Sequence, residues 1–156
     1  MPEDEPVIRA TAFFSFMLIV PRQTKKKIDV NTLAAANGAT AGNIEIDNVD
    51  ASNDLLTLDT VGTLHGAVNT AAGGTIVITN DGAITVVDDG SITDDVAADG
   101  DITLDAADPR VAGGTDNLII DVNADIVSAN GNITLEAGDD LDQRFGGCKL
   151  MAYDEA

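Results

Sequence analysis

Pairs of aspartates at turn-like positions are the residues of this chain best suited to chemistry. Three pairs are adjacent in the sequence, and a fourth pair flanks a glycine. Carboxylate oxygens are the ligands that Ca²⁺ prefers, and stacked turns would bring carboxylates of different turns close together. The candidate metal ligands are Asp88, Asp89, Asp94, Asp95, Asp99, Asp101, Asp139 and Asp140.

The established calcium-binding loops do not occur in the sequence. It contains neither an EF-hand loop nor the repeated Gly-Gly-x-Gly-x-Asp motif of calcium-binding solenoids. Two interpretations of the aspartates therefore stay open: specific ligands for Ca²⁺, or solvated turn residues that keep the surface soluble. No other cofactor is expected.

Paired carboxylates also serve glycoside hydrolysis, which needs two carboxyl groups held at a fixed separation. Sugar-binding sites usually add aromatic rings, but no Phe, Tyr or Trp lies between Met17 and Arg144. His65 is the single histidine and has no second His or Cys nearby, so we expect it on a turn or at the surface. The sequence therefore predicts no catalysis.

The elements that would position these aspartates follow from a repeated unit of two aliphatic residues two positions apart. Such period-two alternation, bounded by Gly, Asn and Asp, predicts short, half-buried β-strands joined by tight turns. The pairs are Ile44/Ile46, Leu56/Leu58, Ile76/Ile78, Ile84/Val86, Ile102/Leu104, Leu118/Ile120 and Ile133/Leu135, with Ile92 and Ile126 as lone units.

The spacing of these units predicts an all-β fold, a right-handed parallel β-helix of about four irregular coils. Many steps between units are close to eight residues, and three such steps would close a coil of roughly 24 to 30 residues. An antiparallel β-sandwich is the alternative, because Asn80-Asp81-Gly82 and Asp88-Asp89-Gly90 suit hairpins. The lack of aromatic residues in the body favours the solenoid, whose narrow interior is filled by stacked aliphatic side chains.

Charge excludes one class of partner. The formal net charge is −19, and residues 28–143 hold 22 acidic residues against one basic residue, Arg110. A surface of this kind repels phosphate backbones, so nucleic-acid binding is not expected.

The two ends differ in composition from the middle. Residues 1–41 contain the apolar run 10–20, which is too short to span a bilayer comfortably, followed by the basic cluster Lys25–Lys27. This segment is interpreted as a cap, a signal-like segment or a mis-set start. Residues 42–142 are predicted to form the solenoid domain, and residues 143–156 an irregular tail.

Two phrases carry a resemblance to a known group of proteins. The sequence Gly-Asp-Ile-Thr-Leu-Asp-Ala at 100–106 and Gly-Asn-Ile-Thr-Leu-Glu-Ala-Gly at 131–138 resemble the degenerate repeats of filamentous-haemagglutinin-like and related large bacterial surface adhesins. The resemblance covers about residues 42–140. It implies export, a long right-handed β-helix, and a passive, ligand-presenting role.

The function expected from these observations is a structural or adhesive repeat segment of a bacterial cell-surface or secreted protein. Its expected partners are extracellular matrix, carbohydrate or protein ligands, without an integral membrane span, and end-to-end self-association is a further expectation. A carbohydrate-active β-helix enzyme fragment and a truncated remnant without independent activity are the alternatives.

Overall fold

The computed structural model describes residues 16–19, 26–28, 30–48, 55–90, 95–106, 116–143 and 149–152, with the backbone alone described for 16–19, 26–28, 143 and 149–152. Within these residues the chain forms strands and no helix, which confirms the all-β prediction. The strands are β1 (Phe16–Ile19), β2 (Lys26–Ile28), β3 (Thr32–Asn37), β4 (Ile44–Asn48), β5 (Leu56–Leu58), β6 (Ala67–Asn69), β7 (Ile76–Asn80), β8 (Ile84–Val86), β9 (Val96–Ala98), β10 (Ile102–Ala106), β11 (Leu118–Ile120), β12 (Asp125–Ser128), β13 (Ile133–Ala137), β14 (Leu141–Gln143) and β15 (Lys149–Ala152).

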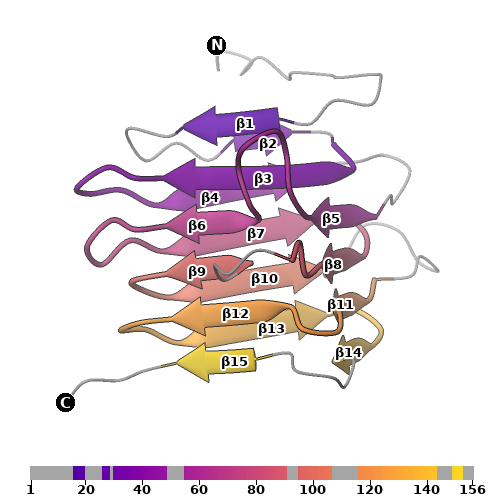
Figure 1. Ribbon diagram of the computed structural model, residues 1–156. Helices are drawn as coiled ribbons and strands as arrows, with labels where there is room; N and C mark the ends of the chain where they lie inside the picture. The colour runs from indigo at the N-terminus through magenta and orange to yellow at the C-terminus, as the bar shows by residue number, and fades with distance from the viewer. Residues whose placement is uncertain are drawn as a thin grey trace, which may run out of the picture.

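The strands form two parallel sheets that run along a stack of layers (Figure 1). The five-stranded sheet has the order β13-β10-β7-β4-β2. The ten-stranded sheet has the order β14-β11-β8-β5-β3-β6-β9-β12-β15, with β1 also paired to β3. Strand β3 joins two columns of strands, because its first residues pair with β5 and its last residues pair with β6.

In the five-stranded sheet, each strand pairs with the strand at the same position in the next layer of the stack. The first residues of successive strands, Ile44, Ile76, Ile102 and Ile133, are register partners. Contacts between neighbouring layers accordingly join residues 32, 26 and 31 positions apart. This pairing is consistent with a β-helix or another solenoid-like fold.

The aliphatic pairs predicted from the sequence all lie in strands: β4, β5, β7, β8, β10, β11 and β13. Alternation places one face of each strand inside the stack, because successive side chains point to opposite faces. The side chains that fill the interior are stacked in register from layer to layer. The largest fully buried ones are Leu33, Ile44, Ile46, Leu56, Leu58, Ile76, Ile78, Ile84, Ile102, Leu104, Leu118 and Ile126.

Two buried asparagine pairs bond the corners of adjacent layers. Asn37 Nδ2 donates to Asn69 Oδ1 at 3.1 Å, and Asn48 Nδ2 donates to Asn80 Oδ1 at 2.7 Å. Each of these four side chains is at most 1% exposed. They also bond turn backbone: Asn69 Nδ2 donates to the carbonyl of Thr75, at 2.9 Å. Burial of an amide that is hydrogen-bonded in this way costs little free energy, and its hydrogen bonds fix the path of the turn.

The antiparallel alternative is wrong for the described residues, since every pairing between named strands is parallel. The turn at Asn80-Asp81-Gly82 joins β7 to β8, which belong to different sheets, so it forms a corner and no hairpin. A short loop can form either a hairpin or a corner between two sheets. The corner forms here because the parallel stacking of layers is the arrangement that buries the aliphatic faces of the strands.

The stacked strands extend beyond residues 42–142. Strand β3 is covered by β5 and β6, and β15 pairs with β12. The apolar run 10–20 contributes β1, whose Phe16 pairs with Leu33; the rest of that run and the lone Ile92 lie outside the described residues. Strands β3, β6 and β9 were not predicted because their inward positions are largely alanine, which gives a weak aliphatic signal.

In the five-stranded sheet, the inward-facing side chains of successive strands form a column, and burial differs along it. The same Leu→Ala substitution should therefore lower stability by different amounts at two positions of this column. Leu104 is fully buried in β10, whereas Leu135, its register partner in β13, is only partly buried. We expect Leu104→Ala to lower the free energy of unfolding by about 3 kcal/mol and Leu135→Ala by about 1 kcal/mol, because only the first leaves an enclosed cavity. Urea denaturation followed by far-UV circular dichroism measures both, and equal losses would contradict the stacking order.

Candidate functional site

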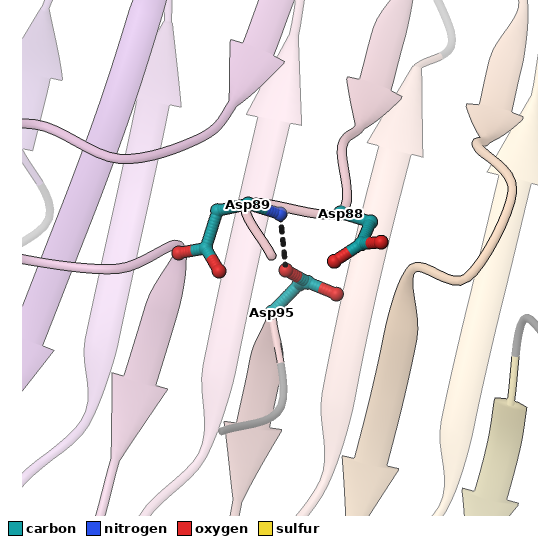
Figure 2. Close-up of side chains that lie close together, drawn as sticks. All are labelled: Asp88, Asp89 and Asp95. Carbon is teal, nitrogen blue, oxygen red and sulfur yellow. Dashed lines mark hydrogen bonds between the residues drawn. The ribbon is translucent and has the colours of Figure 1, made fainter. Parts of the chain in front are cut away.

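The candidate site lies at the corner between β8 and β9. Asp88 and Asp89 follow β8, and Asp95 directly precedes β9. One carboxylate oxygen from each of the three lies within 4.8 Å of the other two. Figure 2 shows the carboxylates of Asp88 and Asp95 close together, with the carboxylate of Asp89 on the other side of Asp95.

Asp95 is the member of this group whose whole residue is buried, with 4% of its surface exposed. Its two oxygens accept hydrogen bonds from different layers of the stack. The N–H of Asp89 donates to Oδ1 at 3.2 Å, and the N–H of Asp125 donates to Oδ2 at 2.8 Å. Asp95 therefore ties the Asp88-Asp89 loop to strand β12 of the next layer.

Burial raises the pKa of Asp95 above its usual range, because the buried carboxylate loses hydration. The two backbone N–H groups oppose this increase, and the negative charges of Asp89 and Asp88 add to it. The corner thus holds an acid that gives up its proton less readily than an ordinary aspartate.

Asp125, which contacts Asp95 through its backbone, carries a further buried carboxylate oxygen. Its N–H is bonded to Asp95, and its own Oδ1 is buried without a hydrogen-bond partner. A buried carboxylate oxygen that accepts no hydrogen bond is unfavourable unless a positive charge or a proton compensates it.

Asp89 also joins the site to the preceding layer. Its Oδ2 lies 2.6 Å from His65 Nδ1 and accepts a hydrogen bond from the hydroxyl of Thr60 at 2.9 Å. The side chain of Asp89 is 3% exposed and that of His65 is 46% exposed. The imidazole ring of His65 therefore lies at the rim of the acidic group.

Gly66 sets how closely the two layers approach at this corner. Its φ is +52°, and a Cβ at this position would lie 1.7 Å from the carbonyl oxygen of Asp95. That carbonyl accepts the N–H of Ala67 at 2.9 Å. A side chain at residue 66 would therefore push Asp95 and the Asp88-Asp89 loop away from His65.

The remaining predicted ligands lie at other corners. Asp99 accepts the N–H of Gly73 at 2.5 Å and the side-chain amide of Asn130 at 2.8 Å, and these bonds hold the pKa of Asp99 below its usual range. Asp101 Oδ1 accepts the N–H of Asn132 at 2.8 Å. These aspartates bond turn backbone in neighbouring layers, as turn residues do.

Asp139 and Asp140 lie between β13 and β14. Asp139 Oδ2 accepts the N–H of Asp116 at 3.2 Å, and the N–H of Asp140 donates to Asn117 Oδ1 at 3.2 Å. Asp94 lies outside the described residues. Of the eight predicted ligands, Asp88, Asp89 and Asp95 are the ones that come together among the described residues.

Thr60 and the contact between His65 and Asp89 were not predicted. His65 and Asp89 are 24 residues apart and Thr60 and Asp89 are 29 apart, which is close to one layer of the stack. The signal that could have predicted these contacts is the number of residues in one coil, which the repeat spacing indicates. Because the loops differ in length, that number is too imprecise to identify which corner residues meet.

The chemistry open to this geometry is the sharing of a proton or the binding of a hard cation by carboxylates. Carboxyl groups that flank a glycosidic bond are about 5 to 5.5 Å apart in retaining enzymes and about 6.5 to 9.5 Å apart in inverting ones. The oxygens of Asp88, Asp89 and Asp95 are closer than that, within 4.8 Å. Their spacing suits the coordination sphere of one ion better than a site that encloses a sugar linkage.

A comparison of the chain with protein-family models found no match. Comparisons with curated proteins and with solved structures found none either. The resemblance to bacterial surface adhesins therefore stays a prediction. Among the described residues, no helix is both long and apolar enough to cross a membrane.

The raised pKa of Asp95 predicts a pH-dependent effect of a neighbouring substitution. An acid whose pKa is higher in the folded than in the unfolded chain destabilises the fold when ionised, and this cost disappears as the pH falls through the folded pKa toward 3.8. Asp88→Asn removes one repelling charge, and its amide oxygen can still accept the N–H of Gly90, which Asp88 Oδ1 accepts at 2.8 Å.

We expect Asp88→Asn to raise the free energy of unfolding at pH 7 by about 0.5 kcal/mol in chelator-treated buffer. The gain should vanish near pH 3, where Asp95 is protonated in both proteins. Denaturant titrations across this pH range measure the difference, and a gain of equal size at both ends would show that charge is not its cause.

Proposed function

We propose that this chain is a structural segment of a bacterial cell-surface or secreted protein, and that its stack of strands is a right-handed parallel β-helix of about four irregular coils. The observation that carries the proposal is the register of the aliphatic columns, such as Ile44, Ile76 and Ile102, through successive parallel strands. Each layer buries its inward face against its neighbours, as in repeat proteins that serve as rigid rods.

The handedness follows from a general property of strand connections. Strands joined by a crossover and paired in parallel are right-handed in nearly all proteins, because the twist of the strands favours that path. The strands of this stack are joined in this way, for example β7 to β10. The same handedness is implied by the resemblance to the adhesin repeats.

The distribution of charge supports a role in surface presentation. Acidic side chains such as Asp99 and Asp101 stand at the corners of the stack and bond turn backbone, and the largest fully buried side chains are aliphatic. A rigid rod with an acidic surface suits contact with matrix, carbohydrate or protein ligands through its sides and corners. This role needs no catalytic residue.

Location of the full chain tests this proposal. In intact cells of the organism that encodes it, an epitope-tagged copy should be degraded by added protease, or should appear in the culture fluid. A cytoplasmic enzyme serves as the control and should remain intact. A tagged chain that is protected in intact cells and found only in the cytoplasmic fraction would overturn the proposed location.

We propose, second, that the corner of Asp88, Asp89 and Asp95 binds a hard divalent cation such as Ca²⁺. The observation that favours it is the group of carboxylate oxygens that lie within 4.8 Å of one another. Asp125, whose N–H bonds Asp95, has a buried Oδ1 that accepts no hydrogen bond. A cation at this corner would offset the lost hydration that raises the pKa of Asp95, and also the smaller repulsion from Asp89 and Asp88. It would also join the loop after β8 to the layers on both sides.

Thermal melts of the full chain with and without Ca²⁺ test the cation. Saturation at about a hundred times the dissociation constant should add about 2.7 kcal/mol to the free energy of unfolding. Asp88→Asn should lose this gain although it stabilises the metal-free chain. The matched control is Asp121→Asn, since Asp121 Oδ1 accepts the next N–H at 2.8 Å in a corner away from the group. A melt that Ca²⁺ leaves unchanged would remove the second proposal and leave the first standing.

A further inference from the structure

Strand β13 forms one edge of the five-stranded sheet and leaves the inward column partly uncovered. Among the described residues β13 pairs with β10 alone. Ile102 and Leu104 of β10 are fully buried, whereas their register partners Ile133 and Leu135 are only partly buried. The described residues provide no further layer to cover them.

The backbone of β13 continues the hydrogen-bond ladder toward this edge. In each earlier layer the first isoleucine of the strand donates its N–H to the following layer. Ile44 donates to Thr75 at 2.9 Å, Ile76 donates to Asp101 at 2.9 Å, and Ile102 donates to Asn132 at 2.8 Å.

Ile133 occupies the same position in its strand, so its N–H faces the edge. In a parallel ladder alternate residues direct both backbone groups to the same side, so Leu135 and Ala137 face the edge too. The edge thus combines a row of donors and acceptors with a partly covered apolar column. That combination is a template for one more parallel strand.

The charge around this edge indicates what kind of strand would fit. Glu136 on the outward face of β13 is exposed, and so are Asp139, Asp140 and Asp142 in the segment that follows. Opposite charges on neighbouring strands are favourable and like charges are unfavourable. An added strand should therefore carry Lys or Arg at its outward positions and aliphatic residues at its inward positions.

The opposite edge of the same sheet fits this description poorly. Strand β2 is basic, but its register with β4 pairs Lys26 with Ile46, in the column that continues through Ile78 to Leu104 and Leu135. Each copy of the chain carries a formal net charge of −19, so two copies repel each other. A second copy is therefore a poor occupant of this edge.

We infer that the edge of β13 that no described strand pairs with binds an extended strand of a partner protein, parallel to β13, with aliphatic residues facing the stack and basic residues facing outward. The partner strand continues the columns of Ile133 and Leu135 and places its positive charges beside Glu136. The inference is independent of where the protein is located and of any cation at the corner of Asp88, Asp89 and Asp95.

A pair of peptides tests the inference on the full chain labelled with nitrogen-15. The peptide GKIKLKAG copies residues 131–138 with lysine at the three outward positions, and GEIELEAG carries glutamate there. We expect the lysine peptide to shift the amide resonances of Ile133, Leu135 and Ala137 and to slow their hydrogen exchange. Its affinity should exceed that of the glutamate peptide by about tenfold or more.

Charge reversal on the protein provides the second arm. Glu136→Lys should reverse or abolish the preference for the lysine peptide. The matched control Glu45→Lys, which makes the same change on β4 of the same sheet, should preserve it. Both variants should keep the thermal stability of the parent, because both side chains point away from the interior.

Three results would overturn the inference. They are absence of binding by either peptide, equal affinity for both peptides, and resonance shifts that lie away from β13. Sedimentation velocity without peptide provides a fourth outcome: concentration-dependent association that protects the amides of Ile133, Leu135 and Ala137 would assign the edge to a second copy of the chain and overturn the partner strand.

Discussion

Stacking of aliphatic side chains between layers is the interaction on which the rest of the structure depends. A strand of three to six residues buries too little surface to be stable alone, so each layer is held by the layers before and after it. The columns that begin at Ile44 and Leu56 show how this works: the same inward position is apolar in successive strands, and parallel pairing keeps the side chains in register. Corners, charges and the candidate site are all placed by this register.

The corners are where the chain departs from regular strands, and they are stabilised by polar contacts that also run from layer to layer. Asn37 and Asn69 bond to each other inside the stack, and Asp99 bonds Gly73 and Asn130 outside it. The acidic composition is thus compatible with a stable fold, because many carboxylates accept backbone N–H groups at turns. The group at Asp88, Asp89 and Asp95 differs because three carboxylates share one corner, where Asp95 and the side chain of Asp89 are almost fully enclosed.

The candidate site and the free edge of β13 are both consequences of layered growth. Asp89 contacts Thr60 and His65 of one layer, and Asp95 bonds Asp125 of another, so the site exists only where three layers meet. At β13 the same stacking leaves an inward column and a row of backbone groups without a further described layer. A repeat fold therefore creates two kinds of functional surface, one at its corners and one at its ends.

The sequence by itself determined the all-β class, the positions of seven strands and the inward residues of each, because period-two alternation between turn residues is a local property. It also identified Asp88, Asp89 and Asp95 as acids at turns. Only the tertiary structure decided that the described strands pair in parallel and that β3, β6 and β9 are strands despite their alanines. It alone also placed Asp95 on the N–H of Asp125, and Asp99 and Asp101 on turn backbone elsewhere. The reason is physical: loops of irregular length shift each layer by a different number of residues, so contacts between corners depend on the register of whole strands, which is set by burial of the aliphatic columns and leaves no local trace in the sequence.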